Sequence, residues 1–256
     1  MSTKLVVGNL KMNLISPAER ESYLQSFQKE FASKKIDNTE VVICPAAVHL
    51  EQFAKELKMK AVSVGAQNAF WEEKGSFTGE ISPLMAKNAG VSHVIVGHSE
   101  RRKYFAESDE IVNVKIKAVL KSGLKPVLCI GETLEQRNDG SMAEVLTMQI
   151  KKGLDGVSAL DVQKAVVAYE PVWAIGSDKT PTSDELLQVK ILIRKTLADI
   201  YGLENAEKVK ILYGGSVKAD LVKDVCLEPE LDGVLVGRES LNPNEFLKIV
   251  EIIDKK

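Results

Sequence analysis

The chain has 256 residues, of which 45% are apolar and 27% charged, as is ordinary for a folded globular protein. Its net charge of −2, with acids and bases interspersed, gives no basic footprint for nucleic acid. No segment approaches the roughly eighteen consecutive apolar residues of a membrane helix, and MSTKLVVGNL lacks the apolar core of a signal peptide. Three widely spaced cysteines without a CxxC pair are typical of a reducing compartment, so we expect a cytoplasmic protein.

Eight short apolar runs, rich in β-branched residues, recur along the chain and predict β-strands. Their hydrophobicity is continuous rather than alternating, which is typical of strands buried on both faces of a parallel sheet. The runs begin roughly every thirty residues, which is the length of one strand–helix unit. The predicted strands are 4–9, 40–44, 61–67, 92–98, 125–131, 164–170, 210–215 and 232–237.

The segments between these runs have helical periodicity. Residues 19–31 place four large apolar side chains on one stripe, and 183–202 begins with Ser183 and Glu185 and stops at Gly202. Helices are also predicted at 106–122, 142–155 and 243–254.

Eight strand–helix units without a linker indicate an α/β protein, a closed (β/α)8 barrel that occupies residues 1–256 as a single domain. A doubly wound open sheet is the alternative, but no GxGxxG turn follows the first strand.

Polar residues gather at the carboxyl ends of the predicted strands, the face of such a barrel that carries catalysis. The opposite ends lack this pattern. Taken singly, each residue has a structural explanation: a solvated lysine, a glutamate at an exposed strand end, glycines that only form turns. Their coincidence favours a site. The residues at these ends are Asn9 and Lys11 after strand one, His98, Ser99 and Glu100 after strand four, Glu170 after strand six, and the turns YGGSVK and VGRES after strands seven and eight.

These residue types together predict proton abstraction next to a carbonyl group. The glycine-rich turns after strands seven and eight, each expected to lead into a short helix, are typical of a phosphate site built from backbone N–H groups and helix N-termini. Glu170 would take the proton, His98 would hydrogen-bond the developing enediolate, and Lys11 would supply positive charge. The other two histidines are expected elsewhere, His49 in a helix and His93 at a strand start. The spacing of His and Cys residues offers no metal ligand set.

Six motifs in this order, GNLKMN, GSFTGEIS, HSERR, CIGE, AYEPVWAIG and YGGSV, resemble the triosephosphate isomerase family across the whole chain. The resemblance implies interconversion of dihydroxyacetone phosphate and glyceraldehyde 3-phosphate, a step of glycolysis and gluconeogenesis, without a cofactor. It implies Glu170 as the base, His98 as the electrophile, Asn9 and Lys11 as substrate contacts, and Glu100 as a catalytic-site carboxylate near Lys11. The amides of Gly176, Ser216 and Gly237 would bind phosphate, and Arg238 lies in the same turn.

The resemblance also implies a lid and a homodimer. Closure of a lid loop over the substrate is a well-known motion in this family. The lid would comprise Pro171, Val172, Trp173, Ala174, Ile175, Gly176, Ser177, Asp178, Lys179 and Thr180. The dimer loop would lie within Gly65–Ser82 and use Gln67, Asn68, Phe70, Trp71, Phe77 and Thr78, whose aromatic rings would otherwise form an exposed apolar patch.

Several positions depart from the family pattern. Leu10 stands where the family usually has Trp, Asp178 and Pro181 alter the end of the lid, and Arg238 replaces a glycine. Arg238 could force a strained backbone, occupy an ordinary turn with its side chain toward solvent, or bind phosphate through its guanidinium; we favour the ordinary turn.

Two other functions are alternatives to the isomerase. A Schiff-base aldolase needs a strand-end lysine in mid-barrel, where this chain has Glu170. A non-catalytic relative would be expected to lack Glu170, His98 or Lys11, and all three are present.

Overall fold

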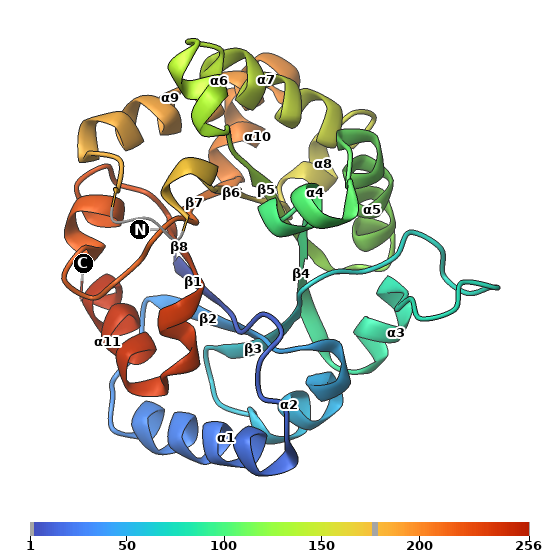
Figure 1. The fold of residues 1–256 in the computed structure, drawn as a ribbon, viewed down its shortest axis with the longest axis vertical. Coiled ribbons are helices and arrows are strands. Elements are labelled where there is room, and N and C mark those ends of the chain that lie inside the picture. The colour runs from blue at the N-terminus through green and yellow to red at the C-terminus, as the bar shows by residue number, and fades with distance from the viewer. Residues whose placement is uncertain (1–2, 176–178, 256) are drawn as a thin grey trace.

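A computed structural model describes residues 3–175 and 179–255, and within them the chain forms a closed barrel of eight parallel strands wrapped by helices (Figure 1). Neighbours in sequence are neighbours in the barrel, and β1 pairs with both β2 and β8 to close it. The strands are β1 (Lys4–Asn9), β2 (Thr39–Cys44), β3 (Val62–Ala66), β4 (Val91–Val96), β5 (Lys125–Ile130), β6 (Val166–Tyr169), β7 (Lys210–Tyr213) and β8 (Gly233–Val236). The predicted fold class is confirmed.

The helices form the outer ring of the barrel. The α-helices are α1 (Pro17–Ala32), α2 (Leu50–Glu56), α3 (Pro83–Asn88), α4 (Ser99–Phe105), α5 (Asp109–Lys121), α6 (Leu134–Asn138), α7 (Met142–Gly153), α8 (Ala159–Val162), α9 (Ser183–Tyr201), α10 (Leu203–Lys208) and α11 (Pro243–Asp254). Short 3₁₀ segments η1 (Ala47–His49), η2 (Val172–Ala174) and η4 (Arg238–Leu241) and a π-helical turn η3 (Lys223–Leu227) complete the described elements.

Strand alternation explains why the apolar runs are continuous. Leu5 and Val7 of β1 point into the barrel, where they pack with residues such as Leu235, whereas Val6 belongs to the layer between barrel and helices. Each strand therefore buries both of its faces. Because apolar side chains fill the barrel interior, functional groups are confined to its ends.

The structure corrects the sequence prediction at three helix boundaries. The predicted helix 106–122 is preceded by a separate helix, α4, which ends where Ala106 adopts the left-handed conformation with φ 50°. Ser108 then caps α5. The cap of α9 is Thr182, which forms a capping box with Glu185, one residue before the predicted start. After β7 the expected short helix is instead η3, which begins only at Lys223.

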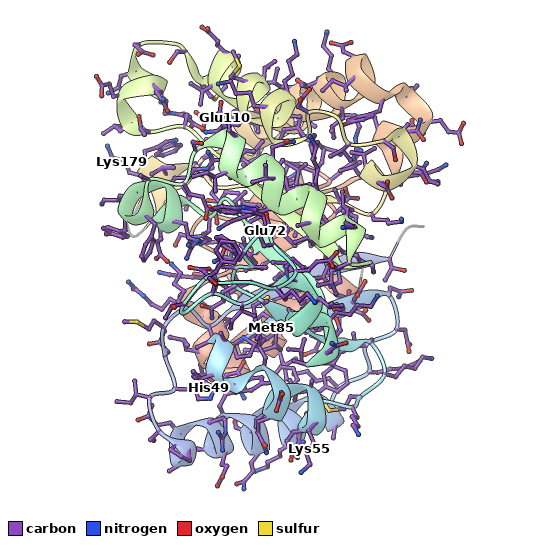
Figure 2. The ribbon with its side chains drawn as sticks, turned by 90° about the vertical axis from the view of Figure 1, so that its right-hand side faces the viewer. His49, Lys55, Glu72, Met85, Glu110 and Lys179 are labelled. Carbon is purple, nitrogen blue, oxygen red and sulfur yellow. The ribbon has the colours of Figure 1, made fainter. Side chains whose placement is uncertain are left out.

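The segment between β3 and α3 projects away from the barrel (Figure 1). Figure 2 views the molecule from this side, with Glu72 of the segment near the middle of the face and Met85 of α3 below it. No helix among residues 3–175 and 179–255 is long and apolar enough to cross a membrane.

Candidate active site

A cavity of about 450 Å³ opens at the carboxyl end of the strands, where the sequence predicted the site. Its walls come from the segments that follow β1, β4, β6, β7 and β8. The predicted residues that line it are Asn9, Lys11, His98, Glu100, Glu170, Ile175, Ser216, Gly237 and Arg238. The fold thus brings the predicted catalytic groups and the two described glycine-rich turns into one space.

Glu170 follows directly after β6 and is 1% exposed. Its backbone N–H donates to the carbonyl of Ile130 on β5 at 2.7 Å, which fixes the backbone position from which the side chain extends. Its Oε2 accepts the backbone N–H of Ser99 at 3.0 Å. Its Oε1 lies 3.1 Å from Nε2 of His98, yet this buried oxygen has no aligned hydrogen-bond donor among the described residues. One carboxylate oxygen is therefore anchored by a backbone N–H, and the other is not.

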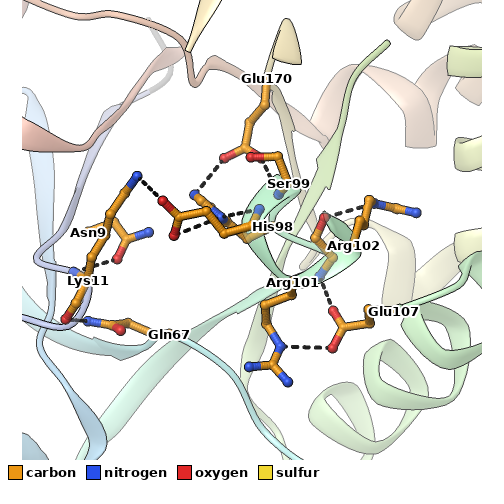
Figure 3. A network of polar contacts seen from close by, with 11 residues as sticks. Asn9, Lys11, Gln67, His98, Ser99, Arg101, Arg102, Glu107 and Glu170 are labelled. Carbon is orange, nitrogen blue, oxygen red and sulfur yellow. Dashed lines mark hydrogen bonds and ion pairs between the residues drawn. The ribbon is translucent and has the colours of Figure 1, made fainter. Parts of the chain in front are cut away.

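His98 caps the N-terminus of α4 with its ring (Figure 3). Its Nδ1 accepts the backbone N–H of Glu100 at 3.2 Å, so this nitrogen carries no proton. The Glu100 carboxylate is 3.7 Å from the same nitrogen, beyond hydrogen-bond length. The ring proton of a neutral imidazole then resides on Nε2, which faces Glu170.

Lys11 is held from three directions. Its backbone has φ 52°, and its N–H donates to Oδ1 of Asn9 at 3.0 Å. Its carbonyl accepts from Nε2 of Gln67 at 2.8 Å, and its Nζ donates to Oε1 of Glu100 at 2.6 Å. A left-handed lysine costs about 1–2 kcal/mol, so these bonds must hold it there. Gln67, predicted for the dimer loop, here supports the lysine of its own chain.

The glycine-rich turns form the other end of the cavity. Gly215 has no room for a side chain, because a Cβ would fall 2.1 Å from the hydroxyl of Tyr213. A Cβ on Gly237 would meet Cε of Lys11 at 3.7 Å, which places this turn beside the lysine. Arg238 is exposed and begins η4 without a positive φ. The strained-backbone reading of Arg238 is therefore wrong.

Glu132 anchors the described part of the predicted lid through Trp173. Trp173 in η2 donates from Nε1 to Oε1 of Glu132 at 2.7 Å, and Tyr169 donates its hydroxyl to the same oxygen at 3.0 Å. The guanidinium of Arg137 lies 4.2 Å from the centre of the Trp173 ring. The predicted lid residues Gly176, Ser177 and Asp178 lie outside the described residues.

The projecting segment carries a cluster of three aromatic rings. The ring centroids of Phe70 and Trp71 are 3.9 Å apart, and those of Phe70 and Phe77 are 4.6 Å apart. Trp71 is 36% and Phe77 42% exposed, and Thr78 beside them is exposed too. Asn68 instead accepts a bond from Nζ of Lys115 on α5, at the base of the segment.

Comparison with known proteins agrees with this geometry. A family model described as triosephosphate isomerase matches residues 4–253. The chain belongs to the triosephosphate isomerase family. A relative named triosephosphate isomerase from Caldanaerobacter subterraneus subsp. tengcongensis is 45% identical over 250 residues, 98% of this chain and 99% of the relative. Proteins of the same name from Dictyoglomus thermophilum (43% over 251 residues, 98% of this chain and all of the relative) and Lactobacillus delbrueckii subsp. bulgaricus (44% over 252 residues, 98% and 99%) are also similar.

Two buried residues of the barrel have no role that the sequence predicts. Glu132 belongs to the CIGE motif, and its position just after β5 could have marked it as a residue at the functional end of the barrel. Cys129 lies on β5, where burial and the nearby Glu170 carboxylate raise the pKa of its thiol well above the ordinary value. The thiol is thus neutral. Among the described residues, no three His, Cys, Asp or Glu side chains are grouped to hold a metal ion.

Proposed function

We propose that this protein interconverts dihydroxyacetone phosphate and D-glyceraldehyde 3-phosphate by proton transfer through an enediolate, in glycolysis and gluconeogenesis. Family membership supports the reaction. The observation that carries it is the buried Glu170 carboxylate, with one oxygen anchored by Ser99 and the other, without a donor, beside Nε2 of His98. A base next to a hydrogen-bond donor is what enolisation requires.

In this proposal Oε1 of Glu170 removes a proton from the carbon next to the substrate carbonyl. Negative charge develops on the carbonyl oxygen, and the Nε2 proton of His98 forms a hydrogen bond to it. The ammonium of Lys11, oriented by Asn9 and Glu100, stabilises the same charge. The protonated Glu170 then returns its proton to the former carbonyl carbon, while the hydroxyl proton of the enediol moves to the former carbonyl oxygen. Both proton shifts together convert ketose to aldose without an added redox group.

The phosphate of the substrate would bind at the glycine-rich end of the cavity. Backbone N–H groups of Ser216, Gly237 and Arg238 are the proposed donors there, because all three residues line the cavity and N–H groups of such turns can bind an anion. Gly176, also predicted as a donor, lies outside the described residues. Ile175 lines the cavity, so lid closure would bring an apolar side chain over the reacting carbons and exclude water.

The proposal is tested with a coupled assay on both triose phosphates. The purified chain should turn over each substrate without added metal or cofactor. Glu170→Asp retracts the carboxylate by one methylene, and a misplacement of about 1 Å costs roughly a hundredfold. We expect kcat to fall by that order while KM changes little. The matched control is Glu110→Asp, in the exposed first turn of α5. Near-normal turnover by Glu170→Asp would remove Glu170 from the role of base.

We further propose a homodimer that buries the aromatic cluster of Phe70, Trp71 and Phe77. Exposed rings of this size are rare on monomers. Thr78, beside them, would approach Asn9 and Lys11 of the other subunit, as the family resemblance implies. Light scattering at nanomolar concentration tests this, since a fully active monomer would contradict it. The three cysteines are all buried and form no disulfide bond, which supports the proposed cytoplasmic location.

A further inference from the structure

Another buried carboxylate, Glu107, contacts the residue that precedes His98 (Figure 3). It follows Ala106, the left-handed residue that separates α4 from α5, and is 5% exposed. Its Oε2 accepts the backbone N–H of Gly97 at 3.1 Å. Its Oε1 accepts from Nε of Arg101 at 2.9 Å and from Nζ of Lys115. The proposed reaction assigns no role to this group.

The peptide groups of Gly97 set the direction in which the chain enters His98. Gly97 has φ 74°, and a Cβ there would fall 2.9 Å from Val112. Its N–H is held by Glu107, and its carbonyl accepts from Nε of Arg102 at 2.9 Å. Both polar groups of the residue before His98 are therefore fixed by side chains rather than by the strand ladder.

We infer that Glu107 is a positioning residue for His98: it orients the imidazole through the Gly97 peptide, and Lys115 holds Glu107 in place. The inference rests on the proposed function of His98. Without Glu107 the buried N–H of Gly97 has no acceptor, so the turn would rotate to find one. Rotation there moves the imidazole relative to Glu170, and about 1 Å of displacement costs roughly a hundredfold in rate.

Charge balance supports this arrangement. Burial raises the pKa of Glu107, but the hydrogen bonds from Lys115 and Arg101 outweigh it and lower the pKa below its ordinary value. The carboxylate is thus ionised at neutral pH and accepts from all its donors. Lys115, itself buried, also donates to Oδ1 of Asn68 at 2.8 Å. The network therefore joins the base of the projecting segment to the turn that carries His98.

Two double variants separate positioning from stability. Glu107→Gln with Lys115→Met removes both charges but keeps an amide oxygen for the N–H of Gly97. Glu107→Met with Lys115→Met removes both charges and the acceptor. Replacing a buried ion pair with groups of similar volume is often neutral for stability, so both proteins should fold. Thermal unfolding is measured on each, and Glu110→Gln on the exposed side of α5 is the single-site control.

We expect the double variant Glu107→Gln/Lys115→Met to keep kcat within about threefold of wild type. The double variant Glu107→Met/Lys115→Met should lose at least roughly tenfold in kcat, with KM changed by less than about threefold. The nitrogen-15 signals of its His98 ring should also shift. Equal kcat values in the two double variants, or unshifted His98 nitrogen-15 signals in Glu107→Met/Lys115→Met, would overturn the inference. The His98 signals can be measured whether or not the protein is active. An inactive wild type would therefore contradict the proposed function, whereas the NMR comparison would still test the role of Glu107.

Discussion

Gly214 and Glu170 pack so closely that a β-carbon added to Gly214 would lie 2.8 Å from Cγ of Glu170 and 3.6 Å from its Oε1. Gly214 is not at a positive φ, so the glycine is required here by space rather than by backbone conformation. We expect Gly214→Ala to push the carboxylate out of place and lower kcat at least roughly tenfold, because the base must be held within a fraction of an ångström. Steady-state kinetics on both triose phosphates measure it.

The matched control for this prediction is Gly153→Ala on α7. There the atoms nearest to the added methyl group belong to Leu128 and Val112, at 3.4 Å or more. Its kcat should stay near wild type. If Gly214→Ala also keeps normal kcat, Glu170 tolerates displacement and the proposed base needs no fixed position.

The tautomer of His98 follows from the N-terminus of α4. Because Nδ1 accepts the N–H of Glu100, the proton of the ring resides on Nε2, where it can reach a substrate oxygen. Nitrogen-15 NMR at pH 7 should show one protonated and one unprotonated ring nitrogen, with the unprotonated one assigned to Nδ1. A ring protonated on both nitrogens would contradict the proposed role of His98.

The residues that line the cavity could be predicted from the sequence because they follow strands, and continuous apolar runs mark where those strands end. Glu170 could be assigned in this way, since it follows the run 164–169 directly. Glu107 could not. Its segment reads as the start of one helix over 106–122, and the break between α4 and α5 arises at Ala106, which has no turn-forming signature. Its partners Gly97 and Lys115 meet it only through the tertiary fold.

Arg238 departs from the family pattern, but the structure shows no backbone strain at this position. Its φ is not positive, and its side chain is exposed at the start of η4, although it borders the cavity. We expect its amide to serve the phosphate and its side chain to contribute little. Arg238→Gly and Arg238→Ala should each leave kcat/KM within about threefold, under roughly 0.7 kcal/mol. A tenfold or larger rise in KM for both variants would make the guanidinium a phosphate ligand.

His93 makes the stability of the fold depend on pH. It lies on β4, 1% exposed, and burial, with a smaller contribution from Lys125, lowers the pKa of its ring from 6.5 to about 3. Glu40, 3.9 Å from Nε2, does not offset this. Between pH 3 and 6.5 the unfolded chain binds a proton that the folded chain does not. The stabilising contribution is therefore complete above pH 6.5 and declines as the pH falls toward 3.

The decline has a slope of up to about 1.4 kcal/mol per pH unit, so we expect a loss of about 2 kcal/mol from pH 7 to pH 5. Urea unfolding of wild type and His93→Gln measures it, at one protein concentration because a dimer would make stability concentration-dependent. Carboxylates that titrate near pH 5 contribute equally to both proteins and cancel in the comparison. The variant should lose about 2 kcal/mol less than wild type over this range. Parallel pH curves for the two proteins would mean that the buried ring accepts a proton in the folded state.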